Sequence, residues 1–310
     1  TIEIHGAANG NAMFSLYDNG ILIASDSMLN SDHFYYDLIV SSGGNHLLEL
    51  IIDNGGSQAP VRDTTFYFSN PSISYVNPPL GLIDGINYVN DSTVTLILNA
   101  PNKSFVYVLG DFNNFLPDSS FFMNKSLDGE RFWLTLNLSP NTRYAYQYWI
   151  DGELKLADPY SELILDPAND PGIPNTTYPN PHPYPTGLTT GHCTLIHPGK
   201  QKYAWKNTNF QAPDKSNLII YELLIRDFAS GTDRNYQMVI DTLDYLVRLG
   251  INAIELMPNN EFENNESWGY NPSYHMALDK YYGTQEKYKE LIDSCHSRGI
   301  AVIMDFVFNH

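Results

Sequence analysis

The stretch that decides the fold lies at the C-terminal end of the chain and reads "IAVIMDFVFNH", residues 300–310. Five apolar residues run without interruption into a segment with three polar side chains: Asp305, Asn309 and His310. A short run that is apolar on both faces is typical of a buried parallel strand. In parallel α/β folds, ligands bind outside the carboxyl ends of the strands. We therefore expect these polar side chains to lie at a functional edge of a sheet.

Two similar apolar runs precede this one, "LIIYELLI" at residues 218–225 and "INAIELMP" at residues 251–258. Helix-like segments separate the three runs: "YQMVIDTLDYLVRLG" has an apolar face and ends at Gly250, and "YKELIDSCHSRG" ends at Gly299. Strands that alternate with amphipathic helices predict parallel βαβ units. We expect residues 214–310 to form such a sheet, with helices on both faces or, in a closed barrel, on one.

The rest of the chain reads as two β-rich blocks and a connector. Residues 1–70 hold short alternating segments separated by turn signals, among them the "DNG" that begins at Asp18, and predict a small Ig-like β-sandwich. Residues 71–165 repeat this pattern and predict a second sandwich. Residues 166–213 are rich in proline, which fixes φ and removes a donor, so we expect an extended connector without helix or strand. Its aromatic side chains suggest that it packs over a surface.

Net charge, hydropathy and cysteine spacing exclude some classes of binding partner and site. The chain has 310 residues, with 17 Lys and Arg against 35 Asp and Glu, and a net charge of −18. A field of that sign repels phosphate backbones, so we expect no nucleic acid partner. No apolar run approaches the about 18 residues of a membrane span, so we expect no membrane insertion. The cysteines, Cys193 and Cys295, match no zinc or redox spacing, and a buried free thiol is expected for Cys295.

Residues that follow the predicted strands are candidates for a binding site. They are Arg226 and Asp227 after the first strand, and Pro258, Asn259 and Glu261 after the second. The long loop at residues 263–283 adds aromatic side chains: Trp268, Tyr270, Tyr274, Tyr281 and Tyr282. Flat rings stack on the C–H faces of sugars, and short polar groups hydrogen-bond to hydroxyls. These residues are compatible with a sugar site, and equally with a minor core packed under a long loop.

Four blocks within residues 220–310 carry a more specific signal: "YELLIRDF", "GINAIELMPNNEF", "WGYNPSYHMALDKYYGT" and "RGIAVIMDFVFNH". In this order and spacing they resemble the start of the catalytic barrel of the α-amylase superfamily, glycoside hydrolase family 13, nearest to pullulanases, isoamylases and branching enzymes. The preceding block, about residues 75–165, resembles the β-sandwich module of those enzymes. The resemblance implies a multidomain protein in which two N-terminal β-sandwiches precede the first part of a (β/α)8 TIM barrel, as far as its third strand.

The resemblance also implies roles for single residues. Tyr270 matches the tyrosine that stacks on the sugar at the cleavage subsite, and Asp305 the aspartate of the third-strand motif. His310 matches the histidine that hydrogen-bonds the same sugar, and Trp268 is a further candidate for substrate binding. Asn309 matches a ligand of a structural calcium ion, Ca2+, in many α-amylases. The catalytic carboxylates of the family follow later strands, so none is expected within this chain.

The implied function is that of an α-glucan-active glycoside hydrolase, which cleaves α-glucosidic bonds in starch or glycogen with retention. The expected partner is an α-glucan polysaccharide or oligosaccharide. A glucan branching enzyme or glucanotransferase, a non-catalytic starch-binding protein, and a protein that binds other sugars remain as alternatives. The first residues, "TIEIHGAANG", lack the regions of a signal peptide and leave the compartment open, with a secreted or cell-envelope location favoured.

Overall fold

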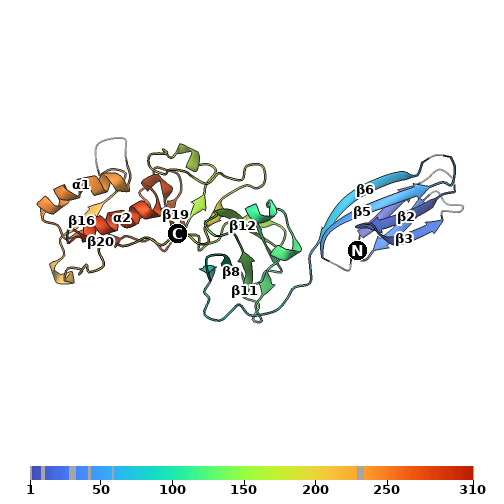
Figure 1. Ribbon diagram of the computed structural model, residues 1–310, viewed down its shortest axis with the longest axis horizontal. Helices are drawn as coiled ribbons and strands as arrows, with labels where there is room; N and C mark the ends of the chain where they lie inside the picture. The colour runs from blue at the N-terminus through green and yellow to red at the C-terminus, as the bar shows by residue number, and fades with distance from the viewer. Residues whose placement is uncertain are drawn as a thin grey trace. The chain divides into compact units, whose positions relative to one another are not determined.

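The computed structural model describes residues 2–7, 11–27, 33–40, 43–57, 59–228 and 234–309. The chain divides into two compact units, Thr1–Ser74 with Pro117–Phe122, and Tyr75–Leu116 with Met123–His310. Antiparallel sheets make up the first unit and the N-terminal part of the second, and a parallel β/α segment completes the second (Figure 1). Over the described ranges, no helix has the length and apolar character needed to cross a bilayer.

The described part of the first unit contains two antiparallel sheets. Their strands are β1 (Ile2–Ala7), β2 (Met13–Asp18), β3 (Ile21–Ser27), β4 (His33–Leu38), β5 (Gly44–Asp53) and β6 (Val61–Ser69). β1 pairs with β4, and the other sheet has the order β3-β2-β5-β6. Leu38 of β4 packs with Leu16 of β2 and Leu48 of β5, so the apolar faces of the two sheets meet. The predicted hairpin joins β2 to β3 through Asn19 and Gly20, whose φ values of 48° and 78° suit a two-residue turn.

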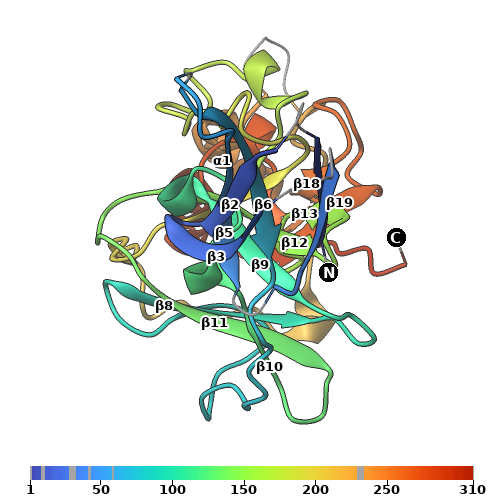
Figure 2. The same cartoon turned by 90° about the vertical axis from the view of Figure 1, so that its right-hand side faces the viewer.

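The second unit begins with two more antiparallel sheets (Figure 2). One has the order β10-β11-β8-β7; the other has the order β13-β12-β15-β14, with β9 on β12. The bounds are β7 (Gly85–Tyr88), β8 (Thr93–Asn99), β9 (Val106–Gly110), β10 (Asn124–Lys125), β11 (Arg131–Asn137), β12 (Tyr144–Ile150), β13 (Leu154–Leu156), β14 (Ile164–Leu165) and β15 (Cys193–Ile196). Tyr146 and Tyr148 of β12 are fully buried, and both hydroxyls donate to Asp158 Oδ2 at 2.8 Å. These two tyrosines of β12 therefore belong to the core.

The sequence predicted no strand within residues 166–213, but the structure has strand β15 there. Cys193–Ile196 pair with β12 on one side and with β14 on the other, and all four residues are buried. The four residues contain no proline, and a central place in the sheet satisfies their backbone groups. The flanking proline-rich stretches lie outside regular strands and include the 3-10 helix η3 (Asp170–Gly172).

The parallel segment has the predicted order of three strands and two helices, but residues 263–283, predicted as a loop, contain a further strand and a 3-10 helix. Its elements are β16 (Ile220–Leu223), α1 (Tyr236–Leu249), β17 (Ala253–Leu256), β18 (Asn260–Phe262), β19 (Pro272–Leu278), η5 (Lys280–Tyr282), α2 (Gln285–His296) and β20 (Ala301–Met304). The parallel sheet has the order β16-β17-β20, and β18 pairs with β19. As predicted, Gly250 caps α1, with a φ of 82°, whereas α2 ends at His296, before the predicted Gly299. Cys193 and Cys295 are buried free thiols, which confirms the prediction for Cys295.

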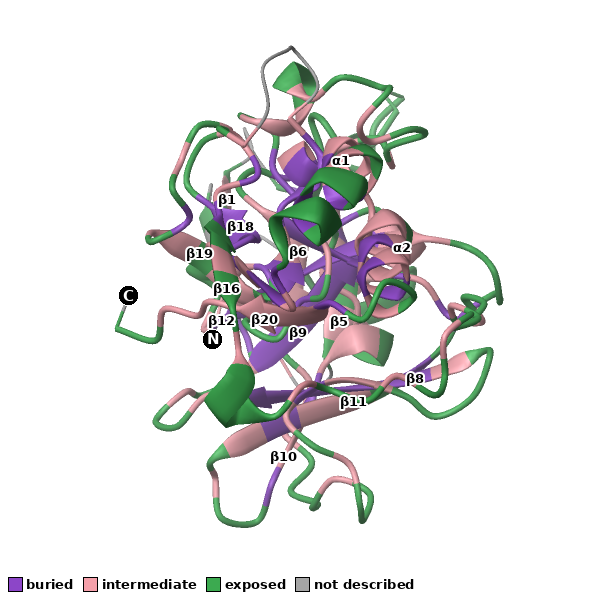
Figure 3. Ribbon diagram, turned by 90° about the vertical axis from the view of Figure 1, so that its left-hand side faces the viewer, coloured by how far each residue is buried: buried purple, intermediate pink, exposed green. Residues whose placement is uncertain are grey.

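The two helices cover one face of the parallel sheet. Leu243 of α1 and Leu291 of α2 share one apolar cluster with Leu223 and Leu256 of the strands, and Figure 3 shows the buried side of α1 turned inward and its exposed side outward. Val247, which the helical period placed on the apolar face, is 43% exposed, because it lies at the margin of that stripe. The opposite face of the sheet carries Glu222 beside Glu255 and Ile303.

Candidate functional site

Two predicted residues meet at the carboxyl ends of the parallel strands. Asp305 directly follows β20, and its backbone N–H donates to the carbonyl oxygen of Leu256 at 2.9 Å, which extends the pairing with β17. Tyr270 lies on the loop between β18 and β19, and its hydroxyl donates to Asp305 Oδ2 at 2.7 Å. A strand end and a loop residue 35 positions apart are thereby joined at the edge where parallel folds place their ligands.

The electrostatics of this edge keep Tyr270 in its donor form. The hydrogen bond to Asp305 raises the pKa of Tyr270 to about 12, and burial and the negative charges of Asp305, Glu222 and Glu255 act in the same direction. The phenol is therefore protonated at neutral pH, while its side chain remains accessible, with the residue 38% exposed. Three carboxylates at one edge disfavour an anionic ligand and leave hydroxyl groups as suitable partners.

A glycine sets how closely the loop approaches the strands. Gly269 has a φ of 90°, and a Cβ there would lie 1.9 Å from the carbonyl oxygen of Pro258. Pro258 follows β17, so the loop is pressed against a strand end, with Trp268 and Tyr270 on either side of the contact. In the sequence, this close contact is marked only by the "WGY" at residues 268–270, and sequence reasoning did not single out its glycine.

In the described part of the chain, the structure gives no hydrogen bond or ring contact between the other predicted site residues and the pair Tyr270 and Asp305. Trp268 lies on the same loop as Tyr270 and is 60% exposed. Asn309 is exposed near the end of the segment that follows β20. His310 lies outside the described residues, so its predicted place beside Tyr270 stays a prediction.

Calcium at Asn309 also stays a prediction. Calcium takes about six to eight oxygen ligands, usually including several carboxylates. In the part of the chain that the structure describes, no group of three or more His, Cys, Asp or Glu side chains is arranged to hold a metal ion.

His275 of β19 holds the segment that follows β20. Its Nε2 donates to the carbonyl oxygen of Val307 at 2.9 Å, and its ring is stacked with that of Phe308 at an interplanar angle of 4°. This histidine connects the strand at the base of the loop to the polar end of β20. Sequence reasoning missed it because a single histidine in an alternating segment carries no positional signal.

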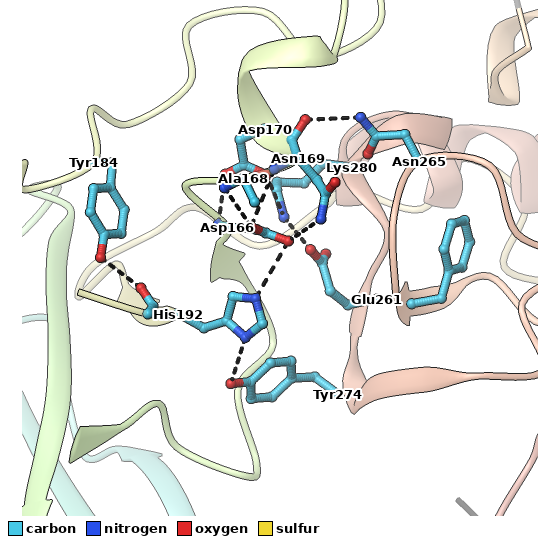
Figure 4. Close-up of polar contacts among 12 residues, drawn as sticks. Asp166, Ala168, Asn169, Asp170, Tyr184, His192, Glu261, Asn265, Tyr274 and Lys280 are labelled. Atoms are coloured by element: carbon cyan, nitrogen blue, oxygen red, sulfur yellow. Dashed lines mark hydrogen bonds and ion pairs between the residues drawn. The ribbon is translucent and has the colours of Figure 1, made fainter. Parts of the chain in front are cut away.

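A buried ion cluster supports the loop that carries Tyr270 (Figure 4). Lys280 Nζ lies 2.6 Å from Glu261 Oε1 and 3.1 Å from Asp170 Oδ1, and the side chains of Lys280 and Glu261 are 4% and 8% exposed. Burial raises the pKa of Glu261, and the ammonium of Lys280 opposes this shift. Burial alone would lower the pKa of Lys280, but the surrounding carboxylates outweigh it and raise that pKa.

This cluster joins both arms of the loop to the proline-rich segment, because Glu261 belongs to β18, Lys280 follows β19, and Asp170 belongs to η3. Glu261 and Asn259, which the sequence placed among the binding candidates, are therefore buried beneath the edge. Asn259 is fully buried and donates to the hydroxyl of Tyr236 at 3.2 Å.

A second polar chain runs beside the ion cluster (Figure 4). His192 lies between Tyr274, at 3.3 Å from its hydroxyl, and Asp166 Oδ2, at 3.4 Å. Asn265 of the loop donates to the carbonyl oxygen of Asn169 at 2.8 Å. Burial works against ionisation of Asp166, but hydrogen bonds, chiefly from His192 and Asn169, outweigh it and lower the pKa of its carboxyl. The proline-rich segment is thus anchored against the loop, as its aromatic content predicted.

Comparisons with known proteins show which family the parallel segment matches. Residues 219–310 match the alpha amylase catalytic domain. The malto-oligosyltrehalose trehalohydrolase of Arthrobacter ramosus is 40% identical over 110 residues, which are 35% of this chain and 19% of that protein. The 1,4-alpha-glucan branching enzyme of Pseudoalteromonas atlantica is 29% identical over 223 residues, which are 68% of this chain and 28% of that enzyme.

The fold also matches a solved structure. A mutant of the pullulanase from Paenibacillus barengoltzii, complexed with maltotetraose, is 21% identical, with a TM-score of 0.56 over 74% of this chain and 38% of that one. The chain spans less than a third of the length of the two curated relatives. The parallel β/α segment corresponds to the start of an alpha amylase catalytic domain, and residues 219–310 therefore belong to the α-amylase family, glycoside hydrolase family 13.

Proposed function

We propose that the intact protein cleaves α-glucosidic bonds in an α-glucan such as starch or glycogen, with retention of configuration. The observation that carries this proposal is the 2.7 Å hydrogen bond from Tyr270 to Asp305 at the carboxyl ends of an α-amylase-type parallel sheet. The pullulanase with a similar fold is complexed with maltotetraose, which supports an oligomer of glucose as the ligand.

In the proposed site, this chain binds and orients the sugar. The ring of Tyr270 stacks on the apolar face of a glucose unit, and its bond to Asp305 holds the ring at a defined angle. Within the described residues, Asp305 Oδ1 makes no hydrogen bond and can accept one from a sugar hydroxyl. Trp268 offers a second ring on the same loop. Retaining cleavage requires two carboxyl groups about 5 Å apart, which we expect from later strands of the family barrel.

Two related activities are the second candidates, because the relatives include a branching enzyme and a trehalohydrolase. Glucan hydrolysis, branching and trehalose release all act on α-glucosidic bonds. They differ in which end of the substrate is cleaved or in which molecule accepts the sugar. Intact protein incubated with amylose should produce new reducing ends if it is a hydrolase, and new branch points if it is a branching enzyme. Release of trehalose from malto-oligosyltrehalose would indicate a trehalohydrolase. A non-catalytic starch-binding protein would give none of these products.

Substitution of Tyr270 tests the proposed site in the intact protein. Tyr270→Ala removes the ring and should cost about 1–3 kcal/mol of transition-state stabilisation, which is measured as a lower kcat/KM on amylose. Tyr270→Phe keeps the ring, so its kcat/KM should fall only by the share that the hydrogen bond to Asp305 contributes. Tyr245→Ala is the matched control, because Tyr245 is an equally accessible tyrosine on α1, 47% exposed. Unchanged turnover in Tyr270→Ala would remove this residue from the site.

A further inference from the structure

Two adjoining cavities lie beside the start of α2. Their volumes are about 420 and 450 Å3, within the range of about 300–1,000 Å3 that small-molecule sites occupy. They share the following lining residues: Tyr88, Glu162, His197, Lys200, Gln285 and Glu286. We call the two together the α2 groove. Its walls come from the ends of sandwich strands, from residues 178–180 of the proline-rich segment, and from the first turn of α2.

The groove is close to electrically balanced, although the chain has a net charge of −18. The first cavity is lined by as many basic as acidic side chains, namely Arg143 and Lys200 with Glu162 and Glu286. The second is balanced as well, with Lys200, Lys202 and Lys289 against Asp91, Glu162 and Glu286. Burial lowers the pKa of His197, and Lys200 and Arg143 act in the same direction, so His197 is neutral at pH 7. A balanced lining favours an uncharged ligand over a phosphate or a carboxylate.

Several polar side chains of the groove have no partner. Among the residues that the structure describes, the side chains of Asn141, Asn180 and Glu162 line the groove and make no hydrogen bond or ion pair. The amides can donate and accept and the carboxylate can accept, which suits a ligand rich in hydroxyl groups. Tyr88 lines both cavities and is 43% exposed, so a ring is available for stacking.

Other contacts make the walls of the groove rigid. Lys200 Nζ lies 2.7 Å from Glu286 Oε1, and the side chain of Gln285 donates to the carbonyl oxygen of Glu162 at 2.7 Å. Arg143 donates to the backbone carbonyl of Asn180 at 3.1 Å. These bonds tie α2 and the proline-rich segment to the sandwich, so the unpaired groups are held in place before a ligand arrives.

We propose that the α2 groove is a second binding site for the α-glucan, separate from the edge at Tyr270 and Asp305. This inference rests on the proposed function, since it takes the same polymer as ligand. One segment of the polysaccharide occupies the groove while another occupies the edge. Because a polymer that is held at one site reaches the other at a high effective concentration, the groove raises affinity for long glucans more than for short ones.

The double variant Asn141→Gly/Asn180→Gly tests the groove in the intact protein. Both asparagines have left-handed backbones, with φ of 58° and 53°, which glycine adopts without strain. Each lost hydrogen bond should weaken binding about 2- to 12-fold, so affinity for glycogen, measured by calorimetry, should fall about 4- to 140-fold when both are lost. The kcat/KM for maltotriose, a short glucan expected to occupy only the edge, should change less than about twofold. Asn102→Gly is the matched control, with φ of 63° outside the groove.

The outcomes separate this inference from the proposed function. Unchanged glycogen affinity in the double variant, or an equal loss in Asn102→Gly, overturns the groove as a glucan site. If the double variant loses affinity selectively, the groove stands, even if the wild-type protein cleaves no α-glucan and the proposed function fails. If the wild-type protein cleaves α-glucans and the double variant binds glycogen normally, only the groove is refuted.

Discussion

Replacement of Lys280 by methionine tests the role of the buried ion cluster. The substitution keeps the length of the apolar stem and removes an ammonium that lies 2.6 Å from Glu261 and 3.1 Å from Asp170. Removing one partner of a buried ion pair costs about 3–5 kcal/mol, because the remaining charge stays buried without compensation. For a unit of this size, that free energy corresponds to a Tm lower by about 6–20 °C. Lys287→Met is the matched control, because its pair with Glu290 is partly exposed and should be worth about 1 kcal/mol or less.

The loss in Lys280→Met should also depend on pH. Burial raises the folded-state pKa of Glu261 to about 8 even beside Lys280, and loss of the ammonium raises it further, so folding takes up a proton. Stability is then greatest at low pH and falls as pH rises through the folded pKa. Chemical denaturation of wild type and variant at pH 5 and pH 8 should show the larger difference at pH 8. Equal losses in Lys280→Met and Lys287→Met, or a loss that is the same at both pH values, would show that Lys280 does not compensate the buried carboxylates.

Two further predictions concern the edge itself. Gly269→Ala would place a Cβ 1.9 Å from the carbonyl oxygen of Pro258, so the loop must move and kcat/KM on amylose should fall at least tenfold. Gly81→Ala has a similar φ of 84° and open space around it, and should cost only about 1–2 kcal/mol of stability with activity unchanged. If a calcium ion is held at Asn309, EDTA should lower the Tm of the intact protein; identical melting curves with and without EDTA would argue against the ion.

Local signals in the sequence were sufficient to predict the parallel strands and the two helices. The apolar runs and the helical period depend on residues a few positions apart, so they predicted β16, β17, β20 and the two helices, and Gly250 as the end of α1. The hairpin between β2 and β3 followed in the same way from "DNG". Strand β15 was missed because it forms by pairing with β12, about fifty residues earlier, and four residues among prolines give no local indication of that pairing.

The supporting contacts of the candidate site were beyond sequence reasoning for the same reason. Nothing in the sequence around Lys280 indicates its partners, and only the folded chain brings Glu261 and Asp170 to it. The resemblance to the α-amylase superfamily singled out Tyr270 and Asp305 separately, without the distance between them.

By itself, then, the sequence indicated the three parallel strands, the two helices and the family that they resemble, because the apolar period, turn residues and motifs all depend on residues close together in the chain. The tertiary structure alone decided which polar groups face one another, such as Tyr270 with Asp305. Hydrogen bonds and ion pairs form over about 3 Å between residues that can be a hundred positions apart, and only the packing of the whole unit sets such distances.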